Sequence, residues 1–440
     1  MTRIEECILY RDFEQGGILK KMTEIMKAIQ ENRDVEPYRQ DFYESLSGLV
    51  EMAGAYGFSG NLWHNYLTFL LVNKENAFST ACEIVGKVEG SVNQMAMHDF
   101  IRFKELYDFD MKAFDRVFGS GDCEIICSYE STGGRKLFNK RIRDRICTLS
   151  ERLEACETVE EFMDDIVRFY QDFGVGKLGL HKAFRVVHRE EGAQIVPITN
   201  IAHVQLSDLV GYEIAKKKLI DNTEAFVKGR RANNCLLFGD AGTGKSSSIK
   251  GILNQYYDQG LRIIEMYKHQ FQDLNDVIAQ IKNRNYKFII YMDDLSFEEF
   301  EIEYKYLKAV IEGGLEKKPD NILIYATSNR RHLIKEEFSD KEGRRDHLHA
   351  SDTVQEKLSL VSRFGVTIFF SAPDRKEFQN IVKTLAERYG VSMPEEKLLA
   401  EANKWEMAHG GLSGRTAQQF IDYLLGKEPE DESMGGQICR

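Results

Sequence analysis

The sequence predicts a mostly helical N-terminal half followed by an α/β domain built around a parallel sheet. Residues 1 to about 118 carry apolar side chains at helical spacing and almost no proline. From Leu206 onward, short apolar runs alternate with helix-compatible segments, which is the pattern of a parallel sheet with crossover helices. Within this part lies Asn234–Ser248, NCLLFGDAGTGKSSS, where an apolar run leads directly into a glycine-rich loop.

Length and composition limit the classes of protein that fit. At 440 residues the chain is long enough for two or three domains, each with its own core. The net charge of −11 argues against a surface covered by nucleic-acid-binding residues. The eight cysteines include no CxxC pair, which favours reduced thiols over a zinc site. We expect a cytoplasmic protein, because the sequence shows no signal peptide and no apolar run of roughly 18 residues.

Residues 1–180 are expected to form a helical domain that recognises a partner. Aromatic residues between Tyr56 and Phe69 are typical of its core. A basic cluster follows a glycine-rich break, on a segment predicted to be helical. Two interpretations are open, a solvated face balanced by nearby acids or a site for an anionic partner. The cluster consists of Arg135, Lys136, Lys140, Arg141, Arg143 and Arg145.

The α/β part of the chain is expected to begin after a linker. Two apolar runs around Glu190-Glu191-Gly192 predict a hairpin within residues 181–205. The core, residues 206–372, is predicted to hold a five-stranded parallel sheet, followed by a small helical lid at 373–427. The polar tail 428–440 is expected to be disordered. The predicted strands are Cys235–Phe238, Arg262–Met266, Phe288–Met292, Ile322–Ala326 and Val366–Phe370.

Gly239–Ser246 has the G-x-x-x-x-G-K-[ST] spacing of a phosphate-binding loop. Its glycines allow successive backbone N–H groups to turn inward around phosphate oxygens, at the N-terminus of the next helix. Lys245 is expected to point at the β- and γ-phosphates rather than pack in the core, and Ser246 to ligate Mg²⁺. The nucleotide-binding residues predicted here are Gly239, Asp240, Ala241, Gly242, Thr243, Gly244, Lys245, Ser246 and Ser247.

Two further strands are predicted to end in polar side chains beside this loop. Asp293 and Asp294 follow one apolar run, and Asn329 follows the next. The carboxyl ends of parallel strands meet at one edge of a sheet. Asp293 is therefore expected to hold Mg²⁺, largely through water, and Asp294 to orient or deprotonate the attacking water. Asn329 is expected to hydrogen-bond that water or the γ-phosphate.

With these motifs the chain resembles the AAA+ ATPases over about residues 206–425. Asp208–Tyr212 looks like the segment that packs on adenine in that superfamily. The resemblance implies that Val210 and Gly211 contact the base. It also implies an α/β P-loop NTPase core that takes ATP and Mg²⁺ as its cofactors.

Two arginines complete the resemblance. Ser362–Gly365 is similar to the S-R-F-G element, which implies that Arg363 acts on the γ-phosphate of a neighbouring subunit in a homo-oligomer. Gly414-Arg415 resembles the helix start that carries the lid arginine called sensor 2. The catalytic residues implied are thus Asp294, Asn329, Arg363 and Arg415. For both arginines the alternative is a structural role at a helix end.

Four phrases are similar to one bacterial AAA+ family of unassigned cellular role, domain of unknown function 815. They are Arg231–Asn234 (RANN), Asp293–Glu298 (DDLSFE), Ala326–His332 (ATSNRRH) and Glu356–Leu360 (EKLSL). The wider superfamily usually has Asp-Glu where this chain has Asp293-Asp294. Because Asp is one methylene shorter, Glu298 on the following turn is an alternative base.

The leading functional hypothesis is Mg²⁺-dependent ATP binding and hydrolysis, coupled to remodelling or assembly of an unidentified protein partner. One alternative is a slowly hydrolysing, nucleotide-gated interaction switch. Another is a nucleic-acid-associated loader, which the acidic balance makes the weaker hypothesis. No membrane partner is expected.

Overall fold

The computed structural model describes residues 3–131, 139–190, 192–296, 303–312, 319–329 and 361–427. The side chains of Tyr304 and Glu312 are excepted. Several predictions lie outside these ranges: the base alternative Glu298, the basic residues Arg135 and Lys136, the phrase Glu356–Leu360, the end of ATSNRRH, and the tail 428–440. The chain forms two compact units, Met1–Lys182 with Pro197–Asn200, and Ala183–Val196 with Ile201–Arg440.

The first unit is helical, as the sequence predicts. Its central helix is α3, Leu62–Asn73, in which every residue from 62 to 72 is buried. A helix that is buried on all sides must be surrounded by others, and here Trp63 and Tyr66 lie fully inside the core. The other helices are α1 Gly17–Gln30, α2 Arg39–Tyr56, α4 Ala77–Val85, α5 Ser91–Tyr107, α6 Lys112–Phe118, α7 Asp122–Cys127, α8 Lys140–Ala155, α9 Val159–Phe173 and α10 Gly176–Leu180.

A buried carboxylate ties the N-terminal segment to this unit. Asp99, on α5, is 0% exposed. Its carboxylate accepts backbone N–H groups from Ile8 at 2.9 Å, Leu9 at 2.7 Å and Tyr10 at 3.0 Å. A buried charge is tolerated only when hydrogen bonds replace its water, and these three donors do so.

The second unit contains a seven-stranded sheet, so the prediction of five strands was wrong. Its strand order is β2-β1-β4-β5-β6-β3-β7. The five predicted strands are all present, and the predicted hairpin adds two more, because β1 pairs in parallel with β4 through Ala183 and Ile263. The strands are β1 Ala183–Arg189, β2 Gly192–Pro197, β3 Cys235–Gly239, β4 Leu261–Glu265, β5 Lys287–Met292, β6 Ile322–Ser328 and β7 Val366–Phe370.

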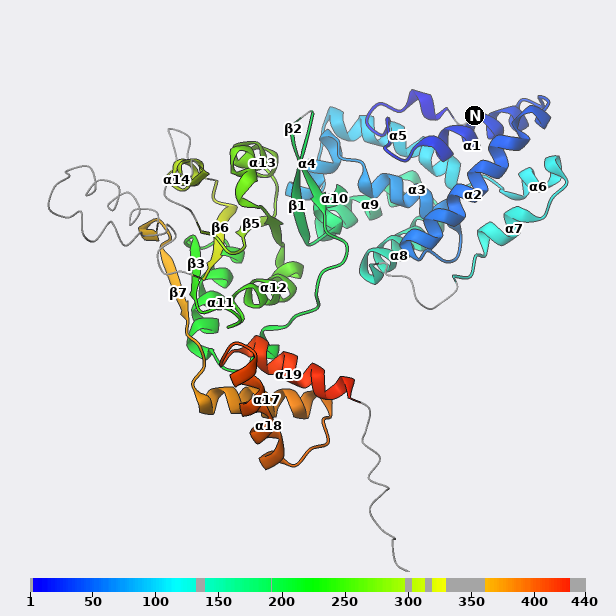
Figure 1. Cartoon of the computed structure of the whole chain (residues 1–440). Helices are drawn as coiled ribbons and strands as arrows, with labels where there is room; N and C mark the ends of the chain where they lie inside the picture. Colours follow the sequence, from blue (N-terminus) through cyan, green and yellow to red (C-terminus); the bar gives the residue numbers. More distant parts are fainter. Residues whose placement is uncertain are drawn as a thin grey trace, which may run out of the picture. The chain divides into compact units, whose positions relative to one another are not determined.

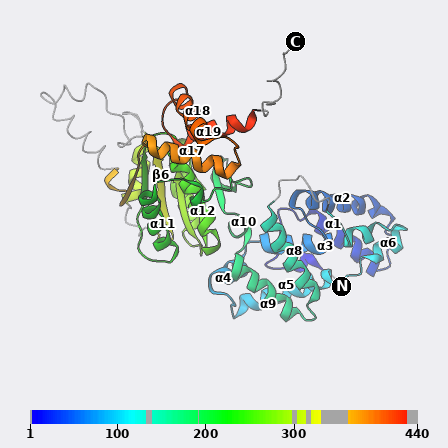
Figure 2. The same ribbon diagram turned by 90° about the horizontal axis from the view of Figure 1, so that it is seen from below.

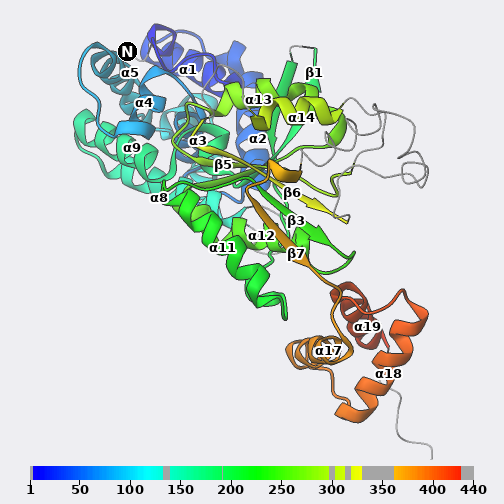
Figure 3. The same cartoon turned by 90° about the vertical axis from the view of Figure 1, so that its left-hand side faces the viewer.

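Helices cover both faces of the sheet. Figures 1 and 3 show α11, Glu213–Val227, and α12, Lys245–Tyr256, on one face. The same views show α13, Leu274–Ile281, and α14, Glu303–Glu312, on the other. Strands β5 and β6 are buried almost throughout, as expected for strands covered on both sides. The pairs from β4 to β7 are all parallel, so these strands present their carboxyl ends at one edge.

Three C-terminal helices form a cluster with a core of its own (Figures 1 and 2). They are α17 Arg375–Tyr389, α18 Glu395–Ala408 and α19 Gly414–Gly426. Asp374 begins α17 with a capping box, since its side chain accepts the Glu377 N–H at 2.8 Å and the Glu377 side chain accepts the Asp374 N–H at 2.9 Å. Val210 packs against the core of this cluster. Within the described part of the chain, no helix is long and apolar enough to cross a membrane.

Candidate functional site

The phosphate-binding loop runs from the end of β3 to the start of α12, where the sequence places it. Gly239 has φ +137°, and a Cβ there would lie 2.0 Å from the carbonyl oxygen of Phe370 on β7. Gly242 has φ +75°, and a Cβ there would lie 2.9 Å from Ser413 Oγ. Larger residues at these two positions are therefore excluded by both backbone conformation and space.

Lys245 is the first residue of α12, and it is only 6% exposed. Its Nζ donates hydrogen bonds to the carbonyl oxygens of Gly239 at 2.9 Å and Asp240 at 2.6 Å. Burial lowers the pKa of Lys245, and the nearby carboxylates of Asp240, Asp294 and Asp293 oppose that shift. The expectation that this lysine packs little was thus wrong, because its ammonium group bonds the loop's own backbone.

Asp293 is held by hydroxyl groups from three elements. Its Oδ1 accepts from Ser246 Oγ on α12 at 2.7 Å, from the Tyr291 hydroxyl on β5 at 2.6 Å, and from Thr327 Oγ1 on β6 at 2.5 Å. Partial burial raises the pKa of Asp293, but the bonds from Thr327, Tyr291 and Ser246 lower it to below its usual value. Asp293 is therefore an ionised carboxylate beside the phosphate loop.

Asp294 and Asn329 form a pair at the same edge of the sheet. Asn329 Nδ2 donates to Asp294 Oδ1 at 2.8 Å. The backbone of Asp294 has φ +49°, and its N–H donates to Thr327 Oγ1 at 2.9 Å. Thr327 thus bonds the carboxylate of Asp293 and the backbone of Asp294, while Asn329 bonds the Asp294 carboxylate. Asp tolerates this left-handed conformation better than most residues.

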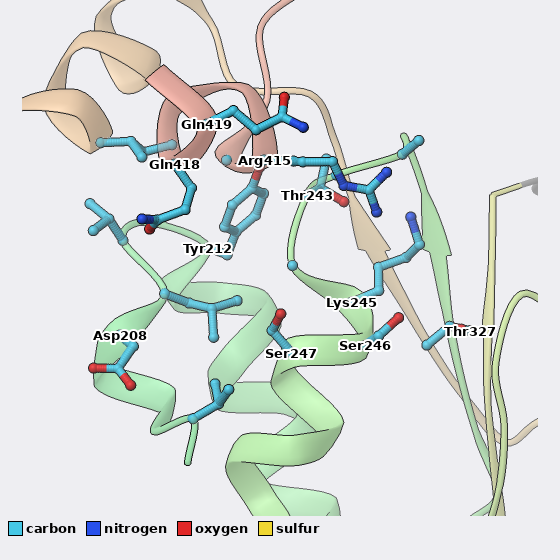
Figure 4. A pocket seen from close by; sticks show the side chains of 18 of the residues that line it. Asp208, Tyr212, Thr243, Lys245, Ser246, Ser247, Thr327, Arg415, Gln418 and Gln419 are labelled. Carbon is cyan, nitrogen blue, oxygen red and sulfur yellow. The ribbon is translucent and has the colours of Figure 1, made fainter. Parts of the chain in front are cut away.

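These residues line a cleft of about 640 Å³. Figure 4 shows Lys245, Ser246 and Thr327 on one side of it, with Asp208, Tyr212 and Gln418 on the other. The predicted site residues that line the cleft are Val210, Ala241, Gly242, Thr243, Gly244, Lys245, Ser246, Ser247, Asp293, Asp294, Asn329 and Arg415. The predicted residues that do not line it are Gly211, Gly239, Asp240 and Arg363.

The C-terminal helices contact the phosphate loop directly. The Arg415 N–H, in the first turn of α19, donates to the Gly242 carbonyl at 3.1 Å. On the other side of the loop, Asp240 Oδ2 accepts the Ala372 N–H at 2.7 Å, in the segment that leads into α17. Asp240 thus binds the connection to the C-terminal helices rather than lining the cleft.

Sequence reasoning assigned no role to several residues of the site, and it named Tyr212 only as the end of the Asp208–Tyr212 segment. Tyr291 lies two positions before Asp293, and Thr327 lies two positions before Asn329. Side chains two positions apart in a strand point to the same face, so these hydroxyl groups could have been predicted to lie near the site. Tyr212 lines the cleft at φ +60°, with its ring 5.4 Å from that of Phe370. The side chains from α17 and α19 carried no signal, since their positions depend on tertiary packing. They are Ile381, Leu385, Gln418 and Gln419.

A family model described as "Protein of unknown function (DUF815)" matches residues 179–428, which is more than half of the chain. The chain belongs to the DUF815 family. The resemblance to domain of unknown function 815, inferred from the RANN and DDLSFE phrases, is confirmed by this match. In the structure of this DUF815 chain, the phosphate-loop sequence joins β3 of the seven-stranded sheet to α12.

Other likenesses of the DUF815 chain are more distant. It is 35% identical over 74 residues to the replication factor C large subunit of Staphylothermus marinus, and this stretch is 17% of each chain. Solved structures similar to it include a RuvB mutant of Thermotoga maritima, with TM-score 0.34 and 18% identity, covering 50% of this chain and 64% of that one. The FIGL-1 AAA domain in complex with ADP has TM-score 0.35 and 17% identity, covering 52% of this chain and 74% of that one. C. elegans PCH-2 has TM-score 0.35 and 16% identity, covering 51% and 65%.

Arg363 of the DUF815 chain is exposed and lies outside the cleft. Its neighbour Phe364 is 3% exposed, and a Cβ on Gly365 would lie 2.6 Å from Asn233. The S-R-F-G element is thus anchored by its last two residues, with Arg363 at the surface. An action on a neighbouring subunit stays a prediction.

Thr327→Val tests the hydroxyl cluster around Asp293. Loss of one buried donor and acceptor is expected to lower the free energy of unfolding at pH 7 by about 1–2 kcal/mol. A lowered carboxyl pKa contributes stability above the unfolded-state pKa, about 3.9, that is lost as the pH falls through the folded-state value. Urea unfolding measures the free energy of unfolding of both proteins. The difference in this free energy between variant and wild type should therefore become smaller below about pH 4. Thr367→Val, at an exposed position of β7, is the matched control.

Proposed function

We propose that this DUF815 protein is a cytoplasmic, oligomeric AAA+ ATPase that binds Mg²⁺–ATP in the cleft between the sheet and the C-terminal helices. The observation that carries the proposal is the 2.7 Å bond between Ser246 and Asp293, next to Lys245 of the phosphate loop. A hydroxyl and an ionised carboxylate are the oxygen ligands that Mg²⁺ takes from a protein when phosphates and waters complete its coordination. The bound metal would neutralise charge on the β- and γ-phosphates.

The chain's own residues divide the work in the cleft. Backbone N–H groups of the loop and the Lys245 ammonium bind phosphate oxygens, and the hydroxyls around Asp293 keep its carboxylate aligned. Asp294 accepts the proton of the attacking water, and Asn329, already bonded to Asp294, orients both. Arg415 adds positive charge from α19.

The bonds between loop and C-terminal helices support a coupling of nucleotide state to movement. A change in the loop acts on α19 through Gly242 and on the start of α17 through Asp240. We propose that the helical first unit binds the protein partner that receives this movement.

A slowly hydrolysing switch is the second candidate. The Asp294–Asn329 bond favours this candidate. Asp294 stands where the superfamily usually has Glu, and its shorter carboxylate is already bonded to Asn329, which makes proton transfer from the attacking water slower. Turnover per subunit separates the two, since a remodelling ATPase cycles continuously and a switch turns over rarely. The 74-residue likeness to a replication factor C subunit is the support for a nucleic-acid-associated loader, which we rank third because of the net charge of −11.

Lys245→Ala is expected to weaken ATP binding by about a hundredfold or more, because charge-assisted bonds to two phosphates are lost. The variant also loses the bonds to Gly239 and Asp240, so a fall of a few degrees in Tm is expected with the fold retained. Binding is measured by isothermal titration calorimetry and folding by circular dichroism. Lys250→Ala, exposed on the same helix, is the control. Unchanged ATP affinity in Lys245→Ala would refute the assignment of the loop.

Asp294→Asn is expected to retain Mg²⁺–ATP binding and to lower turnover by at least about a hundredfold, the scale of general-base loss. Asp293→Asn should instead raise the Mg²⁺ concentration needed for half-maximal activity. Phosphate release at varied Mg²⁺ measures both effects. Turnover that persists in Asp294→Asn but disappears in Glu298→Gln would assign the base to Glu298.

Arg363 is expected to supply its charge to a neighbouring subunit, so activity per subunit should rise steeply as subunits associate. Arg363→Ala and Lys245→Ala subunits should each be inactive alone. Mixing them should restore activity, because one interface then combines an intact loop with an intact arginine. Phosphate release is measured alongside light scattering. A flat rate from monomer to oligomer, without rescue on mixing, would make Arg363 a structural residue.

A further inference from the structure

The end of the cleft away from Lys245 has the character of a slot for a flat ring. Figure 4 places Asp208, Tyr212 and Gln418 at this end, and the phosphate-loop residues Lys245 and Ser246 at the other. Apolar side chains from the core and from α17 also line the cleft, and they are Val204, Leu209, Val210, Ile381 and Leu385. On the proposed function, on which this inference rests, the base of the nucleotide lies here. The question is which base the polar groups of the slot favour.

Several hydrogen-bond acceptors near the slot are already engaged. The Leu209 carbonyl accepts from Lys216 Nζ at 2.9 Å, and the Asp208 carbonyl accepts from Arg388 Nη1 at 3.1 Å. The Asp208 carboxylate accepts the Gln205 N–H at 2.7 Å and lies 3.6 Å from Arg388. Guanine presents the N1–H and N2 amino donors, which a carboxylate without such partners would attract. Because the Asp208 carboxylate already has Gln205 and Arg388 as partners, it does not serve as the acceptor for guanine.

Gln418 lines the slot from α19, and its amide has a set orientation. Its Nε2 donates to Asp422 Oδ1 at 2.8 Å, one helical turn further along. The reversed amide would place the carbonyl oxygen against the carboxylate, and two acceptors in contact repel each other. The bond to Asp422 occupies one of the two N–H groups of Nε2 and fixes the orientation of the amide, so Oε1 is the acceptor that Gln418 offers to a ligand.

We propose that Gln418, oriented by Asp422, determines specificity for adenine at position 6 of the purine. Gln418 Oε1 accepts a hydrogen bond from the 6-amino group of adenine. The same oxygen repels the 6-oxo group of guanine or hypoxanthine, which is an acceptor. Gln418 is the residue that touches the base, and Asp422 is a positioning residue that acts through it.

The test compares ADP with inosine diphosphate, which share the ribose and the phosphates. Adenine has an amino group at position 6 and no hydrogen on N1, whereas hypoxanthine has an oxo group at position 6 and a hydrogen on N1. The full chain should bind ADP about 3- to 10-fold more tightly, the range of one net hydrogen bond. Gln418→Leu should remove most of that preference. Asp422→Asn should reduce it as well, because an amide partner lets Gln418 turn either end toward the base. Purine riboside diphosphate, which has neither group at position 6, should bind between the two in the wild type.

The control is Glu401→Gln, which removes one negative charge from a partly exposed site on α18 outside the cleft, as Asp422→Asn does on α19. This variant should keep the wild-type preference. Equal affinity of the wild type for ADP and inosine diphosphate would overturn the inference while leaving nucleotide binding in place. An unchanged preference in both Gln418→Leu and Asp422→Asn, with folding verified by circular dichroism, would also overturn it. Failure of the wild type to bind any of the three nucleotides would refute the proposed function and this inference with it.

Discussion

The site depends on one oxygen atom, Asp293 Oδ1, which receives hydrogen bonds from three hydroxyl groups. The donors come from α12, β5 and β6, so a single carboxylate joins the phosphate loop to two neighbouring strands. Burial and the charge of Asp293 raise the pKa of Tyr291, which keeps its hydroxyl protonated as a donor. With all three bonds on one oxygen, the carboxylate cannot rotate without breaking them, and its second oxygen has a set direction.

The C-terminal helices are joined to the same loop by bonds that do not involve the cleft's ligand-facing atoms. Gly242 offers its carbonyl outward to Arg415, and Asp240 offers its side chain to Ala372. These two bonds use the Gly242 carbonyl and the Asp240 carboxylate, so they engage neither the loop's backbone N–H groups nor Lys245 Nζ. An acidic residue in a phosphate-binding loop is unfavourable for an anionic ligand. Asp240 has a structural role instead, because its carboxylate binds the segment that leads into α17.

Much of the site was predictable because its residues follow strands that share one edge. The loop spacing, and the positions of Asp293, Asp294 and Asn329 after apolar runs, required only strand order and polarity. The hydroxyl partners required knowledge of which strands are neighbours, and Thr327 meets Asp293 only because β5 pairs with β6. The two extra strands were missed for a similar reason. A hairpin is visible in local sequence, whereas its parallel pairing with β4 is not.

The buried carboxylate of Asp99 has a consequence for the order of folding. Its bond to the Ile8 N–H joins residues 91 positions apart in the chain. During synthesis the N-terminal segment emerges long before α5, so its N–H groups have no carboxylate to bind until about a hundred residues are available. Closing so long a loop is entropically costly and is made favourable by the contacts of the helices between. The segment around Ile8 therefore docks only after its partner helix α5 has been synthesised.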